Sequence, residues 1–214
     1  MTESNRFANR TEAGERLGAT LRERNVDADI VLAIPRGGLP LGRAVADALD
    51  VPLDVVVASK IGAPGNPEYA IGAVASDGSV WRNEGAFEGA GADEEYFERE
   101  RRSEAENARQ KAERYRNGRG EPDLTGKNVV VVDDGVATGS TVRACLQMLA
   151  ATDAERITLA VPVGPPDTVA ELRTMADEGV CLLTPSDFRG VGQFYDRFDQ
   201  VSDEEAMAYL SGRS

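Results

Sequence analysis

The chain has 214 residues, of which 41% are hydrophobic, and its formal net charge at pH 7 is −13. This length suits one α/β domain with a substantial core, and the negative charge argues against a protein that coats nucleic acid, because the phosphates would be repelled. No run approaches the length of a membrane-spanning helix and residues 1–10 lack the apolar centre of a signal peptide, so we expect a cytoplasmic protein.

The first part of the chain alternates apolar runs with a helix-like stretch. A short buried strand is predicted over residues 29–34, and it stops at Pro35-Arg36-Gly37-Gly38. Residues 41–49 follow as a predicted helix, because their apolar residues fall on one face. A second strand is predicted over residues 53–58, ending at Ser59-Lys60.

The middle of the chain contains a hairpin and a long charged stretch. Residues 69–75 and 78–81 are extended runs joined by a Ser-Asp-Gly turn signal. Residues 93–115 are mostly charged, which is typical of a long solvated helix or of a helix that forms only in some states. A glycine-containing linker, residues 118–126, comes next.

The strongest predicted strand, residues 128–132, contains four consecutive valines. Such a strand is typical of a parallel sheet covered by helices on both faces. The later predicted elements are a helix at 143–151, a strand at 156–161, a helix at 168–176, a strand at 180–183 and a helix at 202–210. Ser202 and Glu205 resemble a capping box at the start of the last helix.

Alternating strands and helices, with glycines just after strand ends, predict a single α/β domain over residues 1–214 with a Rossmann-like parallel sheet flanked by helices. The expected parts are a core at 29–185, a flexible lid at 81–120 and a small C-terminal hood at 185–214. Ligands of such folds bind beyond the carboxyl ends of the strands, where the loops after Ile34, Ala58 and Val132 are expected.

The clearest chemistry lies in residues 129–141, which read VVVVDDGVATGST. A buried strand delivers the carboxylates of Asp133 and Asp134 to the sheet edge, and the loop after them leaves backbone amides uncovered at the start of a helix, a site suited to a phosphate. Two acids beside a phosphate site make sense if they face the hydroxyls of a ribose. The alternative is a strand, turn and helix without a ligand; a P-loop lacks its lysine here, and a dinucleotide fingerprint needs another glycine spacing.

This segment resembles the binding motif for 5-phosphoribosyl-1-pyrophosphate (PRPP) in the type I phosphoribosyltransferases. The match consists of the apolar run, the two acids, two small or apolar residues and Ala137-Thr138-Gly139-Ser140-Thr141. Residues 29–210 look like an uncharacterised branch of that family, most clearly at 34–38, 61–68 and 161–166. The resemblance implies the fold of the type I enzymes.

The resemblance implies that the acids and the loop bind different parts of the ligand. Asp133 and Asp134 would hold the ribose hydroxyls, and Gly135 with residues 137–141 would cradle the 5-phosphate. Mg²⁺ is the implied cofactor, bound through PRPP and not by a direct protein site, with Asp133 and Asp134 reaching it through water.

The resemblance also implies the groups around the leaving pyrophosphate. Arg36 and Gly37 would form a pyrophosphate loop and Lys60 would add a point charge, although Arg36 and Lys60 as ordinary surface cations are the alternative. Ala137 stands where the 6-oxopurine enzymes of the family have an aspartate, which argues against a guanine or hypoxanthine acceptor. The chain has no histidine, so no imidazole serves as acid or base.

Two regions are candidates for the acceptor side. Residues 93–115 and their flanks are expected to close as a lid and exclude water, with a static helix as the alternative. Phe188, Phe194 and Tyr195 offer aromatic faces on which a base can stack, or else they anchor the C-terminal segment.

The sequence therefore predicts a phosphoribosyltransferase that moves the phosphoribosyl group from PRPP to a nitrogen acceptor, a nucleobase, and releases pyrophosphate. Its catalytic groups would be Arg36, Lys60, Asp133 and Asp134, acting by position and charge. A PRPP- or nucleotide-binding sensor without transferase activity is the main alternative, and a sugar-phosphate hydrolase is weaker because the loop has no nucleophile. The expected partners are PRPP, pyrophosphate, nucleoside monophosphates and a second copy of the chain in a homodimer, but neither nucleic acid nor membranes.

The charge balance also indicates an environment. Lysine occurs only at Lys60, Lys111 and Lys127. An acidic surface with scarce lysine is typical of adaptation to high salt, where screening weakens self-repulsion. We therefore expect salt to stabilise the fold.

Overall fold

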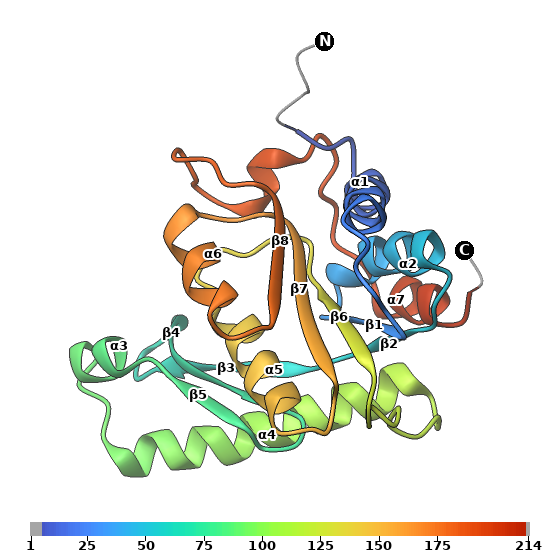
Figure 1. Cartoon of the computed structure of the whole chain (residues 1–214). Coiled ribbons are helices and arrows are strands. Elements are labelled where there is room, and N and C mark those ends of the chain that lie inside the picture. The colour runs from blue at the N-terminus through green and yellow to red at the C-terminus, as the bar shows by residue number, and fades with distance from the viewer. Residues whose placement is uncertain (1–5, 213–214) are drawn as a thin grey trace.

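The computed structural model describes residues 6–212, which form two β-sheets and the helices around them (Figure 1). The larger sheet is parallel, in the order β2-β1-β6-β7-β8, and the smaller sheet is antiparallel, in the order β3-β4-β5. The strands are β1 (Ile30–Ala33), β2 (Leu53–Val55), β3 (Ala58–Ala63), β4 (Asn66–Ala75), β5 (Val80–Arg82), β6 (Asn128–Val132), β7 (Arg156–Val163) and β8 (Glu178–Leu183). The helices are α1 (Arg10–Glu23), α2 (Gly38–Leu49), α3 (Glu84–Gly89), α4 (Glu94–Arg116), α5 (Ser140–Ala150), α6 (Pro166–Arg173), η1 (Val191–Phe194, a 3-10 helix) and α7 (Asp203–Leu210). The predicted α/β class is confirmed.

The central strands face two cores, one on each side of the larger sheet. In β6, Val130 and Val132 pack into the core shared with α1 and α2, while Val129 and Val131 pack into the core shared with α5 and α6. All four valines are buried, as expected for a strand covered on both faces. Because the parallel register sets Ala33 beside Val132, the loops after β1 and β6 leave the sheet at the same edge.

The second predicted strand is wrong in its extent. Residues 55–58 are all apolar, but β2 ends at Val55 and the chain then bends into β3 of the smaller sheet. Val56 and Val57 are buried at the bend, so their hydrophobicity does not show where one strand ends and the next begins. Lys60 consequently lies inside β3, opposite Ala73 of β4, and not at the end of a parallel strand.

No element is predicted before residue 29, yet residues 10–23 form α1. Its Leu17 and Leu21 are fully buried in the core shared with α2. Asn9 caps the helix, because its side chain accepts a hydrogen bond from the Glu12 amide. The helical signal is weak in this stretch because two of its inward-facing positions are glycines, which have low helix propensity.

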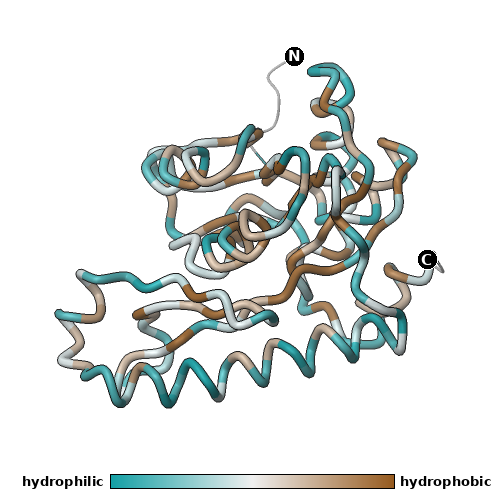
Figure 2. Tube along the Cα trace, turned by 60° about the horizontal axis from the view of Figure 1, so that its bottom comes forward, coloured by the Kyte–Doolittle hydropathy of each residue, from teal (hydrophilic) through white to brown (hydrophobic). Residues whose placement is uncertain are grey.

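The charged stretch forms α4, which runs beneath the smaller sheet and is hydrophilic along most of its length (Figure 2). Phe97 packs into the core of the smaller sheet, and Tyr115 near the other end packs into the core that contains α7. Arg116 is buried and donates to Asp54 (Nε to Oδ1, 3.2 Å) and to the Val55 carbonyl (3.1 Å). Closure of residues 81–120 as a lid stays a prediction.

The N- and C-terminal segments lie side by side. The Phe7 amide donates to the Phe194 carbonyl (2.7 Å), and the Asp196 amide donates to the Phe7 carbonyl (2.8 Å). The predicted capping box of Ser202 and Glu205 is confirmed at the start of α7. The small unit beside the parallel sheet is the antiparallel sheet, whereas residues 185–212 of the expected hood pack against the N-terminal segment and α2. Within residues 6–212, no helix combines the length and apolar character needed to cross a bilayer.

Candidate functional site

A cleft of about 360 Å³ opens at the carboxyl edge of the parallel sheet. The loop after β1, the loop after β6 and the C-terminal segment around Phe198 enclose it, as the parallel register requires. Five of the residues predicted from the sequence line it, namely Arg36, Gly37, Asp133, Asp134 and Thr141. The structure therefore brings together the two loops that carry the main site prediction.

Asp134 is held at three points. Its Oδ2 accepts from Nε of Arg10 at 2.7 Å, its carbonyl accepts from the Tyr195 hydroxyl at 2.6 Å, and its amide donates to Oδ1 of Asp133 at 2.8 Å. The side chains of Arg10 and Asp134 are only 12% and 14% exposed, so this ion pair is largely withdrawn from water. Asp134 is thus fixed by both terminal segments of the chain.

The two acids titrate abnormally. Burial, with a contribution from the neighbouring Asp134, raises the pKa of the Asp133 carboxyl well above its ordinary value. Burial also raises the pKa of Asp134, but the hydrogen bond and the positive charge of Arg10 oppose that rise. A pair of partly desolvated acids is costly for the fold, and such pairs are typical of functional sites.

Gly37 makes the close approach of the two loops possible. A Cβ atom built on Gly37 would lie 2.1 Å from Oδ2 of Asp134. No side chain fits there unless the carboxylate moves, so the sequence requires glycine at this position for a reason of space. The Pro35-Arg36 peptide bond in the same loop is cis.

Two carbonyl groups of the loop before α5 accept hydrogen bonds from side chains. The Ala137 carbonyl accepts from the Thr168 hydroxyl at 3.1 Å, and the Thr138 carbonyl accepts from the Arg143 guanidinium. Gly139 has φ +73°, a conformation that favours glycine. Among residues 6–212, no carbonyl or side chain accepts from the amides of residues 137–141, so these amides and the start of α5 are available to an anion.

Arg36 lies at the border between this cleft and a second cavity of about 270 Å³. Its Nη1 is 3.6 Å from Oδ1 of Asp203, a carboxylate that also receives Arg114 (2.7 Å) and the Tyr115 hydroxyl (2.9 Å). Burial and Asp203 raise the pKa of Tyr115 to about 12. Lys111 also lines the second cavity, so three cations border it in a strongly acidic protein.

Lys60 is not brought to the cleft. Its ammonium group donates to the Glu68 carboxylate at 3.0 Å and lies on the smaller sheet. The role of Lys60 at the pyrophosphate depended on the second strand ending at Ser59, and that strand ends earlier. Contact between Lys60 and a ligand stays a prediction.

The predicted aromatic residues have different positions. Phe194 and Tyr195 are 6% and 2% exposed, and Phe188 stacks on Phe194 with ring centroids 5.6 Å apart. In this arrangement they anchor the C-terminal segment, which is the alternative given for them. Phe198, which the sequence did not single out, is 36% exposed and lines the cleft.

Sequence reasoning also missed the groups that support the site. Arg10 lies more than 120 positions from Asp134 and belongs to an unpredicted helix. Arg143 and Thr168 hold the loop before α5 through hydrogen bonds from α5 and α6. No local pattern marks these residues, because each contributes through a contact that only the tertiary structure creates.

The donor set suits Mg²⁺ only in part. Asp133 and Asp134 supply hard carboxylate oxygens, but Oδ2 of Asp134 is engaged by Arg10. Within residues 6–212, no cluster of three or more Asp, Glu, His or Cys side chains has the arrangement of a metal site. The two carboxylates alone do not form a complete Mg²⁺ site, and they suit a Mg²⁺ ion that is already bound to a phosphorylated ligand.

The chain is similar to one family model and to several proteins of known sequence or structure. Residues 8–199 match the family model described as "Phosphoribosyl transferase domain". A Mycobacterium tuberculosis protein named "Putative phosphoribosyl transferase" is 43% identical over 204 residues; the match covers 95% of this chain but 46% of that protein, so the chain spans about half its length. The crystal structure of TT1426 from Thermus thermophilus is 41% identical, covers 98% of this chain and 99% of its own, and superposes with a TM-score of 0.82. A Neisseria gonorrhoeae protein crystallised with ppGpp shares the fold at 16% identity, with a TM-score of 0.50 and coverage of 95% and 92%.

Proposed function

The chain belongs to the phosphoribosyl transferase domain family, and from that premise we propose that it transfers the 5-phosphoribosyl group of PRPP to a nitrogen acceptor and releases pyrophosphate. The observation that carries this proposal is the cleft in which Asp133 and Asp134 face the loop of Arg36 and Gly37, next to the free amides that open α5. One phosphorylated ribose with a diphosphate fits these three features.

The proposed roles follow from charge and position. Asp133 and Oδ1 of Asp134 accept hydrogen bonds from the ribose hydroxyls, and the amides of residues 137–141 bind the 5-phosphate. Arg36 exchanges its contact with Asp203 for the diphosphate. When Mg²⁺ is bound with PRPP, it supplies positive charge to the diphosphate oxygens.

The chemistry then needs little more than positioning. The bond between C1 of the ribose and the diphosphate oxygen breaks, a bond from C1 to the acceptor nitrogen forms, and the proton on that nitrogen passes to water. The side chains hold the two reactants and stabilise the leaving charge. A nucleobase is the proposed acceptor, because residues 129–141 resemble the PRPP-binding motif of the type I phosphoribosyltransferases.

The experiment is a binding titration followed by a turnover assay. We expect calorimetry with Mg²⁺ to detect association of PRPP, and labelled PRPP to yield a nucleoside monophosphate and pyrophosphate with one base of a panel. Absence of binding by both PRPP and nucleoside monophosphates would reject the proposal.

A PRPP or nucleotide sensor is the second candidate. It is favoured by one observation: the aromatic faces of Phe194 and Tyr195 are buried, so two of the three predicted acceptor contacts are occupied by packing. Tight binding of PRPP without pyrophosphate release for any base would favour the sensor over the transferase.

A further inference from the structure

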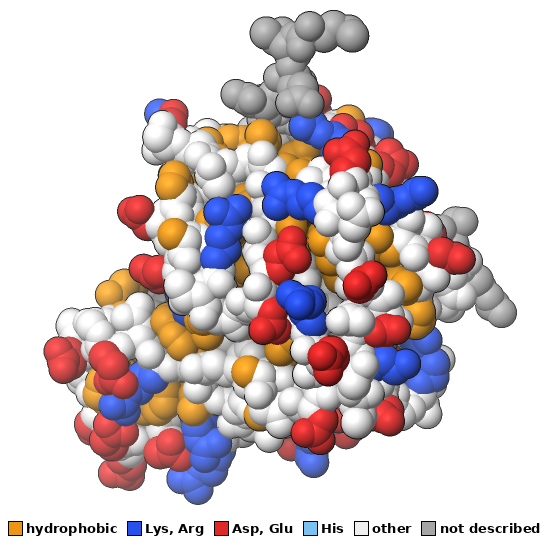
Figure 3. All heavy atoms as spheres, in the orientation of Figure 1, with side chains coloured by type: hydrophobic (Ala, Val, Ile, Leu, Met, Phe, Trp, Pro, Cys, Tyr) orange, Lys and Arg blue, Asp and Glu red, His pale blue; other side chains and the backbone are white. Residues whose placement is uncertain are grey.

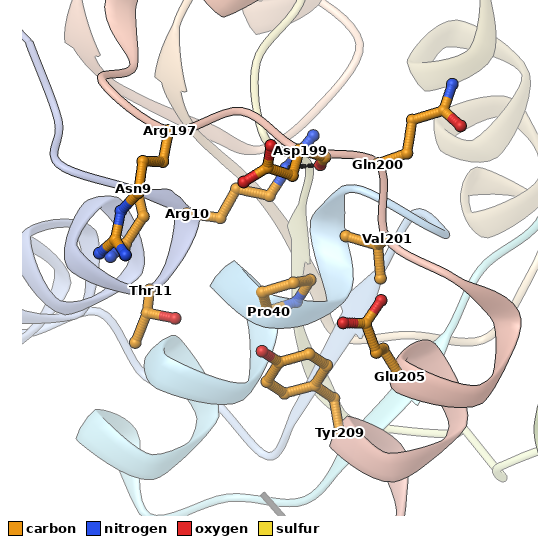
Figure 4. Close-up of a pocket in the computed structure, with 10 residues that line it drawn as sticks. All are labelled: Asn9, Arg10, Thr11, Pro40, Arg197, Asp199, Gln200, Val201, Glu205 and Tyr209. Atoms are coloured by element: carbon orange, nitrogen blue, oxygen red, sulfur yellow. Dashed lines mark hydrogen bonds between the residues drawn. The ribbon is translucent and has the colours of Figure 1, made fainter.

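Arg10 is the one cation of α1 whose guanidinium enters the cleft region with a buried acid as its partner. Its Nε donates to Oδ2 of Asp134 at 2.7 Å, and its Nη1 donates to the Asp199 carbonyl at 2.7 Å. Figure 4 shows the Arg10 side chain reaching from α1 to Asp199, with the second of these hydrogen bonds dashed. The guanidinium carbon also lies 3.8 Å from the centroid of the Phe198 ring.

These contacts leave Arg10 little freedom. Phe198 stacks on Tyr195 with ring centroids 5.0 Å apart, and the Tyr195 hydroxyl donates to the Asp134 carbonyl. Arg10, Phe198, Tyr195 and Asp134 therefore form a closed ring of contacts, in which Arg10 binds the Asp134 carboxylate and Tyr195 binds the Asp134 carbonyl. The guanidinium group is planar and permanently charged. These contacts therefore fix Oδ2 as the oxygen of Asp134 that Arg10 binds.

We propose that Arg10 is the positioning residue of the sugar site: it engages Oδ2 of Asp134 and directs Oδ1 toward the ribose hydroxyls. The identity of the ligand in this inference rests on the proposed function, whereas the contact between Arg10 and Oδ2 of Asp134 does not depend on it. Without Arg10, the Asp134 carboxylate is free to rotate, and it sits beside Asp133 without a compensating charge. A preorganised acceptor binds a diol better than a mobile one, because less freedom is lost on binding.

The test is a double-mutant cycle of Arg10→Gln and Asp134→Asn, read by calorimetry with PRPP and Mg²⁺. We expect each single variant to weaken binding by about tenfold, the loss of roughly one hydrogen bond to a charged group. The double variant should bind no more weakly than Asp134→Asn alone, because Arg10 acts through Asp134. Unchanged affinity in Arg10→Gln, or losses that multiply in the double variant, would overturn the proposal.

Arg16→Gln is the matched control. Arg16 lies on the same helix, pairs with Glu12 at 3.7 Å and lies 4.7 Å from the Phe7 ring centroid, but it does not line the cleft. This variant should bind PRPP as the unchanged protein does. A loss equal to that of Arg10→Gln would show that any weakening of α1 is sufficient, and it would reject a specific role for Arg10.

A second measurement does not depend on the ligand. The charged groups nearest Asp134 are Arg10 from α1 and Asp133, and the Tyr195 hydroxyl reaches it from the C-terminal segment. In Arg10→Gln, carboxyl ¹³C titration should place the midpoint of the Asp133 and Asp134 pair at a higher pH than in the unchanged protein. An unmoved midpoint would overturn the proposal even if PRPP does not bind, whereas a moved midpoint without PRPP binding would reject only the proposed function.

Discussion

Asp133 and Asp134 are adjacent and both partly desolvated, but within residues 6–212 only Asp134 has a cationic partner. The raised pKa of Asp133 means that the folded state binds its proton more tightly than the unfolded state does. Its contribution to stability is therefore favourable at low pH and is lost as pH rises from the ordinary value of 3.8 toward the raised folded value. Above that range the raised pKa of Asp133 lowers the stability of the fold.

We predict that Asp133→Asn raises the melting temperature at pH 7 while it weakens PRPP binding. The asparagine keeps an oxygen that can accept from the Asp134 amide, and it removes the carboxyl group whose ionisation is disfavoured in the fold. Thermal unfolding from pH 4 to pH 8 checks this, because the gain over the unchanged protein should grow with pH. A variant less stable than the unchanged protein at pH 7 would contradict the assignment of a raised pKa.

Gly37→Ala tests the close approach between the loops. The added methyl group would lie 2.1 Å from Oδ2 of Asp134, so the carboxylate must move and lose its contact with Arg10. We expect PRPP affinity to fall at least tenfold while the circular dichroism spectrum is retained, since the loop is at the surface of the cleft. Gly190→Ala is the control, because nothing lies within 4 Å of its added Cβ atom. Equal binding by both variants would count against the site geometry.

At the scale of elements, α4 is fastened to β2 by a buried ion pair. The side chains of Arg116 and Asp54 are 6% and 12% exposed, and Arg116 also binds the Val55 carbonyl. Removing one partner of such a pair leaves an uncompensated buried charge, which costs about 3–5 kcal/mol. Any movement of α4 as a lid must therefore pivot on this end or break the pair.

We predict that Arg116→Met lowers the free energy of unfolding by about 3 kcal/mol, as measured by urea denaturation. The double variant with Asp54→Asn should recover much of this loss, because it removes the orphaned charge. Arg109, on the exposed face of the same helix, pairs with Glu106 one turn away, so Arg109→Met should change stability by less than about 1 kcal/mol. Equal effects at both positions would show that α4 is not anchored through Arg116.

For the whole molecule, the net negative charge is the property that we expect to control how stability depends on salt. The net charge is −13, and acidic and basic side chains are interspersed over the face shown in Figure 3. Local pairs thus offset only part of the repulsion among the 37 acidic residues. The Debye screening length falls to about 3 Å at 1 M salt, and this stronger screening removes most of the long-range repulsion.

We predict that the melting temperature rises steadily between low salt and molar KCl. Repulsion in the folded state decreases with screening, while the buried Arg116–Asp54 and Arg10–Asp134 pairs are screened much less. Differential scanning calorimetry over a salt series measures the shift. A melting temperature that stays flat or falls with salt would reject adaptation to a saline environment.

The sequence by itself determined the elements whose signal is local. Four successive valines define β6 because a strand covered on both faces must be apolar throughout, and the acids and small residues after it identify the phosphoribosyltransferase family by their order. The capping box at Ser202 is equally local, since both of its hydrogen bonds join residues three positions apart.

Only the tertiary structure decided the features that depend on distant contacts. The break between β2 and β3 lies inside an apolar run, so hydrophobicity cannot reveal which sheet each half joins. The partnership of Arg10 with Asp134 joins residues 124 positions apart, and it arises because the terminal segments pair beside the cleft. Local patterns specify which groups are available, whereas packing decides which of them meet.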